Sequence, residues 1–155
     1  MPTRYKGTSQ ERFALDACLK LSRAALSLDR YLERTNIYGD LTASQFHVLD
    51  ALFYLGPLSQ KVIGEKLIKS GGNITMVIDN LEKKGFVQRT PDTNDRRVTN
   101  IILTIEGQSI FEETMQGYVK TIVEAANELS PVELQTLGVL CKKMGLSILH
   151  KLPTQ

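Results

Sequence analysis

The sequence predicts a mainly α-helical protein with a small β-wing. Two observations lead to this fold class. Residues 59–104 show two short helical patterns separated by a glycine-containing turn, followed by two β-branched segments on either side of a charged loop. Outside that stretch, apolar residues recur at helical spacing over three runs, each roughly 20 residues and so about 30 Å long as a helix. Together they predict a winged helix-turn-helix flanked by long N- and C-terminal helices.

The N-terminal part is expected to form one long helix and one shorter helix. The long helix covers residues 11–34, after a loose arm at residues 1–9. Its apolar positions form one stripe: Phe13, Ala17, Leu21, Ala24, Ala25, Leu28, Tyr31 and Leu32. After a loop at 36–40, Thr42 and Gln45 form a capping box, in which hydroxyl and amide each accept a backbone N–H. We expect the second helix to begin at this box and to end at Gly56.

The helix-turn-helix pattern occupies residues 59–84. Apolar residues at helical spacing mark a short helix over 59–69, and the paired glycines within 70–73 favour a turn after it. A second helix is expected over 73–84. Its apolar residues stand at i, i+3, i+4 and i+7: Ile74, Val77, Ile78 and Leu81. Gly85 closes this helix at the position where a left-handed residue is usual.

The wing is expected at residues 86–104. Segments 86–90 and 98–104 are rich in β-branched residues and predict a two-stranded ribbon. The residues between them are polar and charged, so they predict an exposed loop at its tip.

Two further long helices are expected after the wing. Thr104 caps the first, which runs to about residue 129. Ser130 and Glu133 form a second capping box, with Pro131 at the first helical position, where its missing N–H costs nothing. The last helix runs from this box to about residue 151.

Charge and side-chain type make nucleic acid the natural partner of residues 59–104. This stretch holds eight Lys and Arg against five Asp and Glu, whereas the rest of the chain holds 11 against 12. All of the positive excess therefore lies here. The face of the second helix opposite its apolar face carries short side chains with hydrogen-bonding ends, which suit the edges of bases in a major groove. A solvated helix face is the alternative.

The pattern assigns candidate DNA contacts on this helix and after it. Four residues are expected at base edges: Asn73, Thr75, Met76 and Asn80. Three basic residues are expected at phosphates: Lys83, Lys84 and Arg89. Two residues in the turn before the helix and three in the charged loop of the wing complete this set: Ser70, Gly71, Asp95, Arg96 and Arg97.

We expect one domain over residues 1–155, with a winged-helix DNA-binding part at 37–104 and a helical dimerisation part at 10–36 and 105–151. The apolar stripes of the long helices exceed what the winged part could cover. A monomer with an extended helical cap is one solution. A homodimer is favoured, because helix-turn-helix proteins gain affinity and symmetry by pairing two half-sites.

Composition excludes several other classes. The chain has no run of about 18 apolar residues, which a transmembrane helix needs, and no apolar secretion signal at its N-terminus. Its two cysteines make no disulfide framework. His47 and His150 lack metal-ligand spacing, and no P-loop, dinucleotide fingerprint or nucleophile elbow is present. We therefore expect a cytoplasmic protein that is not an enzyme and holds no metal or cofactor.

Several of these segments resemble the MarR family of bacterial transcriptional regulators. The resemblance lies in residues 63–67, 72–75 and 81–85, and above all in the wing, where Asp95-Arg96-Arg97 is followed by Leu103-Thr104 and Gly107. It covers almost the whole chain, including the long flanking helices, which in the family interlock as a dimer. In the family, the arginine matching Arg97 reaches into the minor groove and the aspartate matching Asp95 holds it by a salt bridge. The negative potential of a narrow minor groove suits such an arginine.

The predicted function is sequence-specific binding of double-stranded DNA by a transcriptional regulator, a repressor released by a small molecule, an oxidant or an electrophile. The alternative from another class is a winged-helix protein-interaction module that binds no DNA. Strong salt dependence of binding would separate the two.

Cys18 is a candidate sensor of the releasing signal. In the peroxide-sensing branch of the family a reactive cysteine stands near the start of this helix, and Cys18 lies 27 residues before Gln45, at the expected spacing. The tyrosines that would polarise its thiolate fall at Ser22 and Leu32, so the chain departs from that branch. Residues 21–24 and 95–99 look nearer to members that answer quinones and other aromatic electrophiles. The alternative is a buried packing residue, which the helical spacing favours.

A reversible aromatic effector is the other route to regulation. In the family, anionic aromatic molecules bind where the long helices meet the winged part. The resemblance implies a pocket with these candidate lining residues: Phe46, Asp50, Tyr54, Met115 and Tyr118. Each of them is also compatible with ordinary packing.

Overall fold

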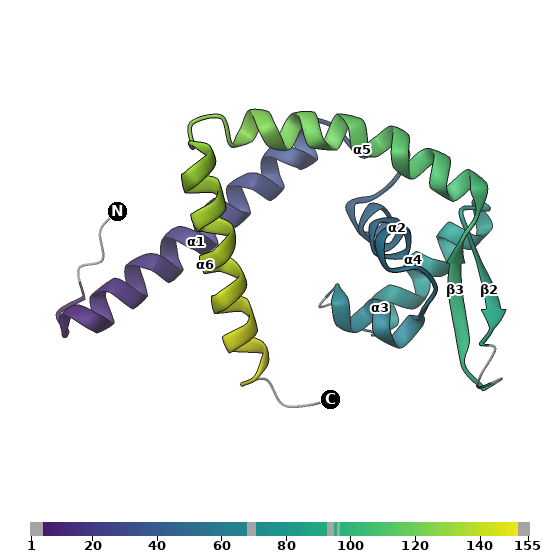
Figure 1. The fold of residues 1–155 in the computed structure, drawn as a ribbon, viewed down its shortest axis with the longest axis horizontal. Helices are drawn as coiled ribbons and strands as arrows, with labels where there is room; N and C mark the ends of the chain where they lie inside the picture. Colours follow the sequence, from purple (N-terminus) through teal and green to yellow (C-terminus); the bar gives the residue numbers. More distant parts are fainter. Residues whose placement is uncertain (1–4, 68–70, 93–94, 96, 152–155) are drawn as a thin grey trace. The chain divides into compact units, whose positions relative to one another are not determined.

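The computed structural model of the protein describes residues 5–67, 71–92, 95 and 97–151 (Figure 1). The chain divides into two compact units, residues 1–119 and 120–155. The helices and strands follow one another in this order: α1 Ser9–Arg34, α2 Ala43–Leu55, β1 Leu58–Ser59, α3 Gln60–Lys66, α4 Gly71–Lys83, β2 Val87–Pro91, β3 Thr99–Leu103, α5 Ile105–Ala125 and α6 Pro131–Leu149. The mainly helical fold with a small β-wing is confirmed.

The capping residues define where most helices begin. In α2 the Gln45 N–H donates to Thr42 Oγ1 at 3.2 Å, while Thr42 N–H donates to Gln45 Oε1 at 2.9 Å. The same reciprocal pair joins Ser130 and Glu133 at α6. Both predicted capping boxes are confirmed. A third box at Thr8 and Glu11 starts α1 at Ser9, so the expected loose arm is shorter than predicted.

Two helix ends differ from the sequence-based expectation. The helix after the turn begins at Gly71, so the paired glycines lie inside α4 and not before it. Helix propensity penalises glycine by only about 1 kcal/mol, which tertiary packing of the apolar face of α4 can offset. The helix after the wing ends at Ala125, four residues before the expected end at residue 129, and residues 126–128 form a turn.

The sheet has one more strand than the predicted ribbon. β2 and β3 pair antiparallel with Arg89 opposite Ile101, and β1 adds to the other edge of β3 with Leu58 opposite Ile101. The strand order is therefore β1-β3-β2. Two residues are too few to show the alternation that marks a strand in a sequence, and for this reason β1 could not be predicted.

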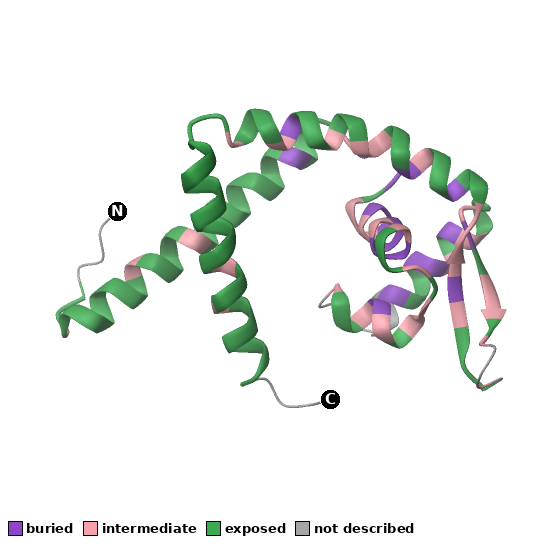
Figure 2. Ribbon diagram, viewed as in Figure 1, coloured by how far each residue is buried: buried purple, intermediate pink, exposed green. Residues whose placement is uncertain are grey.

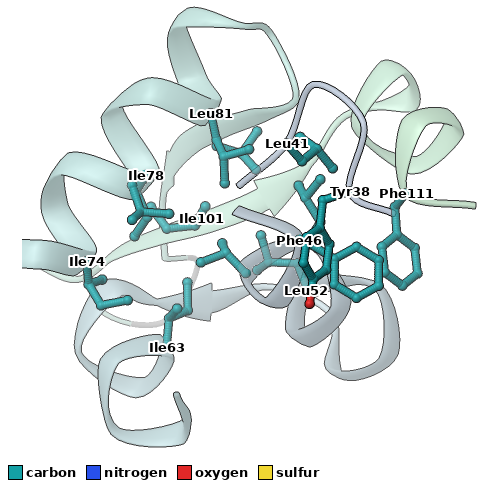
Figure 3. Close-up of a cluster of buried hydrophobic side chains, with 14 residues drawn as sticks. Tyr38, Leu41, Phe46, Leu52, Ile63, Ile74, Ile78, Leu81, Ile101 and Phe111 are labelled. Carbon is teal, nitrogen blue, oxygen red and sulfur yellow. The ribbon is translucent and has the colours of Figure 1, made fainter. Parts of the chain in front are cut away.

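The core lies among α2, α3, α4, the sheet and the first half of α5. Its buried members include the four apolar residues predicted for α4. Figure 3 shows the aromatic rings of Tyr38, Phe46 and Phe111 at one end of this core and the aliphatic side chains of Ile63 and Ile74 at the other. A single core of this kind holds the helix-turn-helix and the base of the ribbon together.

Glycine is required at two places that connect α4, β2 and α5. Gly85 has φ of 75°, and the N–H of Phe86 after it donates to Leu81 O at 3.0 Å, which ends α4 as predicted. Gly107 lies in the first turn of α5, where an added Cβ would overlap the carbonyl oxygen of Phe86. The chain can therefore pass from wing to α5 only without a side chain at residue 107.

The long terminal helices leave most of their apolar side chains exposed (Figure 2). Of the described residues of α1, Leu32 alone is buried, and none is buried in α6. Phe13 is 75% exposed and Val132 is 71% exposed. Within the described chain, no helix is both long and apolar enough to cross a membrane.

Candidate nucleic-acid interface

Helix α4 separates its apolar and polar residues as the sequence predicts. Ile74, Val77, Ile78 and Leu81 are buried in the core. The opposite face exposes Thr75, Met76, Asn80 and Lys83. Met76 is a large apolar side chain that the described residues leave 61% exposed. The face is therefore available to a partner and offers hydrogen-bonding and apolar contacts of the kind base edges take.

Four other predicted contacts have no described side chain. Ser70 and Arg96 lie outside the described residues. Gly71 and Asn73 belong to the backbone of α4, but the burial of these two residues is not described. Their assignments stay predictions.

Two side chains of the predicted interface are held by other elements. Gln60, at the start of α3, donates its amide N–H to Thr75 Oγ1 at 2.6 Å. Lys84, just after α4, donates to the carbonyl oxygen of Asp40 at 2.7 Å and so joins the end of α4 to the loop before α2. Gln60 is not among the residues that the sequence predicts for the interface, because only the folded helix-turn-helix brings residues 60 and 75 together.

Arg89 is engaged on α4 by two carboxylates. Its Nη2 lies 2.6 Å from Asp79 Oδ1, and its Nη1 forms a second ion pair with Glu82. The Arg89 backbone N–H also donates to Glu82 Oε1 at 3.2 Å. The hydrogen bond that the guanidinium donates to Asp79 is the largest cause that raises the pKa of Arg89 above its ordinary value, so Arg89 stays charged. The fork of a guanidinium suits such a pair of partners.

The wing tip presents Arg97 on an aspartate support. Arg97 Nε lies 3.0 Å from Asp95 Oδ1, its Nη2 lies 3.2 Å from Asp95 Oδ2, and its backbone N–H donates to Asp95 Oδ1 at 3.0 Å. The predicted salt bridge is therefore present. These hydrogen bonds lower the pKa of the Asp95 carboxyl. The Arg97 side chain is 90% exposed, so it is held in place and remains accessible.

Asp92 organises the turn beneath that tip. Its Oδ1 accepts the backbone N–H of Asp95 at 3.0 Å, and its Oδ2 accepts Asn100 Nδ2 at 2.7 Å. Asp92 N–H and Val98 O close the ribbon at 2.8 Å. Asp92 and Asn100 were not predicted as site residues, although an Asp at a turn is a familiar sign of side-chain bonding to the backbone two or three residues later.

Comparison with known proteins identifies the family of this chain. Residues 41–99 match the MarR family. The protein YkoM of Bacillus subtilis (strain 168), named as an uncharacterized HTH-type transcriptional regulator, is 34% identical over 131 residues, which cover 84% of this chain and 85% of YkoM. This chain belongs to the MarR family. It is accordingly a DNA-binding transcriptional regulator with the winged-helix fold that the sequence predicts.

Two solved structures are similar to this protein over most of the chain. A mutant MarR from E. coli, complexed with operator DNA, has a TM-score of 0.72 and 28% identity and covers 90% of this chain and 99% of its own. BpsR of Bordetella bronchiseptica, whose DNA binding is regulated by 6-hydroxynicotinic acid, has a TM-score of 0.74 and 26% identity, covering 83% and 98%. Membership of this family does not favour the alternative of a protein-interaction module without DNA binding.

In this MarR-family chain the predicted effector residues lie around an aromatic cluster. Phe46 is buried, with its ring centroid 4.8 Å from that of Tyr118, and Tyr38 lies 6.1 Å from Tyr118. Burial is the main cause that raises the pKa of both phenols and of the Asp50 carboxyl. Met115 packs against the same core, whereas Tyr54 is 63% exposed. Phe46 and Tyr118 thus pack against each other, and the pocket stays a prediction.

Cys18 lies on an open face of α1. It is exposed in the chain, as are its helix neighbours Leu15 and Leu19. The expected burial is wrong for a single chain, because the stripe of α1 next to Cys18 is largely uncovered there. Cys141 is partly buried on α6.

Proposed function

We propose that this MarR-family protein is a cytoplasmic homodimeric repressor that binds a specific double-stranded operator and is released by a small molecule. The observation that carries the proposal is the pairing of two exposed contact surfaces in one winged unit. One is the polar face of α4, and the other is the aspartate-supported Arg97 at the wing tip. A helix and an arginine presented in this way suit adjacent major and minor grooves.

The proposed readout divides the interface by contact type. Asn73, Thr75, Met76 and Asn80 would meet base edges, and Lys83 would meet phosphate together with Ser70, Gly71 and Arg96. Lys84 would reach phosphate while holding the loop before α2. Complex formation between E. coli MarR and operator DNA supports this arrangement for a relative of the same fold.

Dimerisation is supported by the apolar side chains that each terminal helix leaves exposed. Leu26 of α1 is 56% exposed and Val139 of α6 is 62% exposed, within helices that bury almost none of their described residues. An apolar surface of this extent on a water-soluble regulator is favourable only when a partner covers it. A second copy of the chain would cover it and would pair two recognition helices.

Salt dependence of binding to the region upstream of the protein's own coding sequence tests the DNA proposal. Six or more phosphate contacts by a dimer would lower affinity about a thousandfold or more between about 50 and 200 mM salt. Fluorescence anisotropy with a labelled duplex measures this slope. A flat profile, or affinity equal to that for a scrambled duplex, contradicts sequence-specific repression.

We also propose that the effector is a small aromatic molecule bound near Phe46 and Tyr118. The regulation of BpsR by 6-hydroxynicotinic acid supports an effector of this class for a relative. Cys18 is the competing target, through covalent reaction with an electrophile or oxidant. Titration of the protein–operator complex with a quinone and with an aromatic acid, in wild type and Cys18→Ser, separates the two. If the quinone releases DNA from the wild type but not from Cys18→Ser, the signal acts through Cys18.

A further inference from the structure

We propose that Arg89 is a positioning residue that fixes the wing to the recognition helix α4, and is not itself a phosphate contact. This inference deepens the proposed function and rests on it. The sequence predicts a phosphate contact because Arg89 is basic and follows α4. The structure instead gives its guanidinium two carboxylate partners on α4 and its backbone N–H a third bond to the same helix.

We call the contacts of Arg89 with Asp79 and Glu82 the joint. The position of Arg89 along the ribbon makes this joint effective. Arg89 stands opposite Ile101 of β3, and Leu58 of β1 stands opposite the same residue on the far edge. The ribbon is thus anchored at one level on both edges, by β1 on one side and by α4 on the other. Beyond that level Arg97, Val98 and Thr99 are exposed, and Asp92, Asp95 and Asn100 are only partly buried. None of these residues belongs to the core.

The wing tip depends on that anchor for its direction. A ribbon outside the core is held in orientation only at its base, since a two-stranded hairpin is marginal by itself. Arg89 joins the base to Asp79 and Glu82, which lie one turn apart on the helix that carries Asn80. Arg97 at the tip and the exposed face of α4 are therefore presented to DNA in one fixed geometry.

The joint also changes the charge that α4 presents. Asp79 and Glu82 are partly exposed on the helix that faces DNA, where free carboxylates would repel phosphates. Pairing them with Arg89 offsets much of that repulsion. A phosphate contact by Arg89 would have to break these ion pairs first.

Two substitutions separate a positioning role from a phosphate contact by the sign or size of the effect. Arg89→Lys keeps the positive charge but loses the fork that spans two carboxylates, so DNA affinity should fall about tenfold, the equivalent of one charge-assisted contact. Glu82→Ala removes a negative charge near the DNA. Simple electrostatics predicts tighter binding from that change, whereas loss of the joint predicts weaker binding. Glu65→Ala on α3 is the matched control for removing an exposed carboxylate.

A double-mutant cycle with Arg97 provides a readout that a general loss of stability would not move. We expect Arg97→Ala to weaken binding about tenfold in the wild type but less than about threefold in Arg89→Lys, because the tip is no longer aimed. Arg89 and Arg97 share no contact among the described residues, so additive losses would overturn the proposal. Wild-type affinity in Arg89→Lys, or tighter binding in Glu82→Ala, would overturn it as well. Circular dichroism and thermal unfolding establish that each variant is folded.

Amide hydrogen exchange tests the joint without DNA and so independently of the proposed function. The Arg89 N–H donates to Glu82, so Glu82→Ala should speed its exchange about tenfold or more. Unchanged exchange would overturn the inference even if the protein binds DNA as proposed. A wild-type protein that binds no duplex would instead reject the proposed function, while exchange at Arg89 would still decide whether the joint exists.

Discussion

At the scale of single residues, the wing tip joins a charged contact to its own support. The Arg97 side chain is 90% exposed and would adopt many rotamers without Asp95. The Asp95 carboxylate accepts three hydrogen bonds from Arg97 and so restricts it. The lowered pKa of Asp95 means that the support is fully present above the carboxyl's ordinary pKa and is lost as pH falls through the lowered value. Between about pH 5 and 8 the pair should therefore contribute to DNA binding without pH dependence.

We predict that Asp95 acts on DNA through Arg97. Arg97→Ala should weaken binding about tenfold or more while leaving unfolding unchanged, since the tip adds nothing to the core. Asp95→Ala should weaken binding less, and the double variant should bind no worse than Arg97→Ala alone. Anisotropy titrations of the four proteins give the coupling. Losses that add would mean that Asp95 contacts DNA or another group independently.

Gly107 is a second residue whose identity is imposed by geometry. Gly107→Ala would force a methyl group against the Phe86 carbonyl, and separating α5 from β2 should lower the free energy of unfolding by about 1–3 kcal/mol. Gly117→Ala, on the same helix with open space around a Cβ in the described chain, is the control and should raise stability by up to about 1 kcal/mol. Urea denaturation at one fixed protein concentration measures both. Equal effects would show that the close approach does not decide the choice of glycine.

At the scale of elements, the sequence predicts what repeats along the chain and misses what the fold brings together. The apolar spacing of α4 and the boxes at Thr42 and Ser130 are local patterns, so the helices and their starts follow from them. The role of Arg89 depends on Asp79 and Glu82, which reach it only after β2 folds back on α4. A basic residue after a recognition helix therefore looks like a phosphate contact until its partners are known.

The wing loop gives a test at this scale, because Asp92 and Asn100 hold the turn that carries Asp95. Asn100→Ala removes the donor to Asp92 Oδ2 and should weaken DNA binding about three- to tenfold by loosening the turn. Thr99→Ala, at the exposed neighbouring position in β3, is the control and should change affinity little. Faster amide exchange at Asp95 in the first variant alone would identify the cause. Equal losses in both variants would mean that the ribbon, and not this bond, sets the effect.

At the scale of the whole molecule, dimerisation and DNA recognition are linked. The exposed apolar faces of α1 and α6 would pair two chains, and each chain would bring one DNA-binding surface on its winged unit. A single winged unit reads only a few base pairs. Two units joined by a symmetric interface read two half-sites whose spacing is fixed by the dimer. In the proposed dimer, the interface would therefore contribute to the DNA specificity of the protein as well as to its stability.

The dimer and the half-site spacing can be tested in one experiment. Val139 is 62% exposed on α6, and Val139→Asp should dissociate the dimer by placing a charge in the proposed interface. Gln135→Asp, one turn earlier at an exposed position, is the control and should leave the dimer intact.

Half-sites should lie about 10–10.5 base pairs apart, and an insertion of about 5 base pairs turns one of them to the opposite face of the duplex. The insertion should weaken wild-type binding about tenfold to a hundredfold, because only one half-site can then be engaged. The dissociated Val139→Asp protein should bind both duplexes equally weakly, as measured by sedimentation and anisotropy at the same concentration. A monomeric wild type, or one that tolerates the insertion, would contradict a dimer that reads two half-sites in successive major grooves.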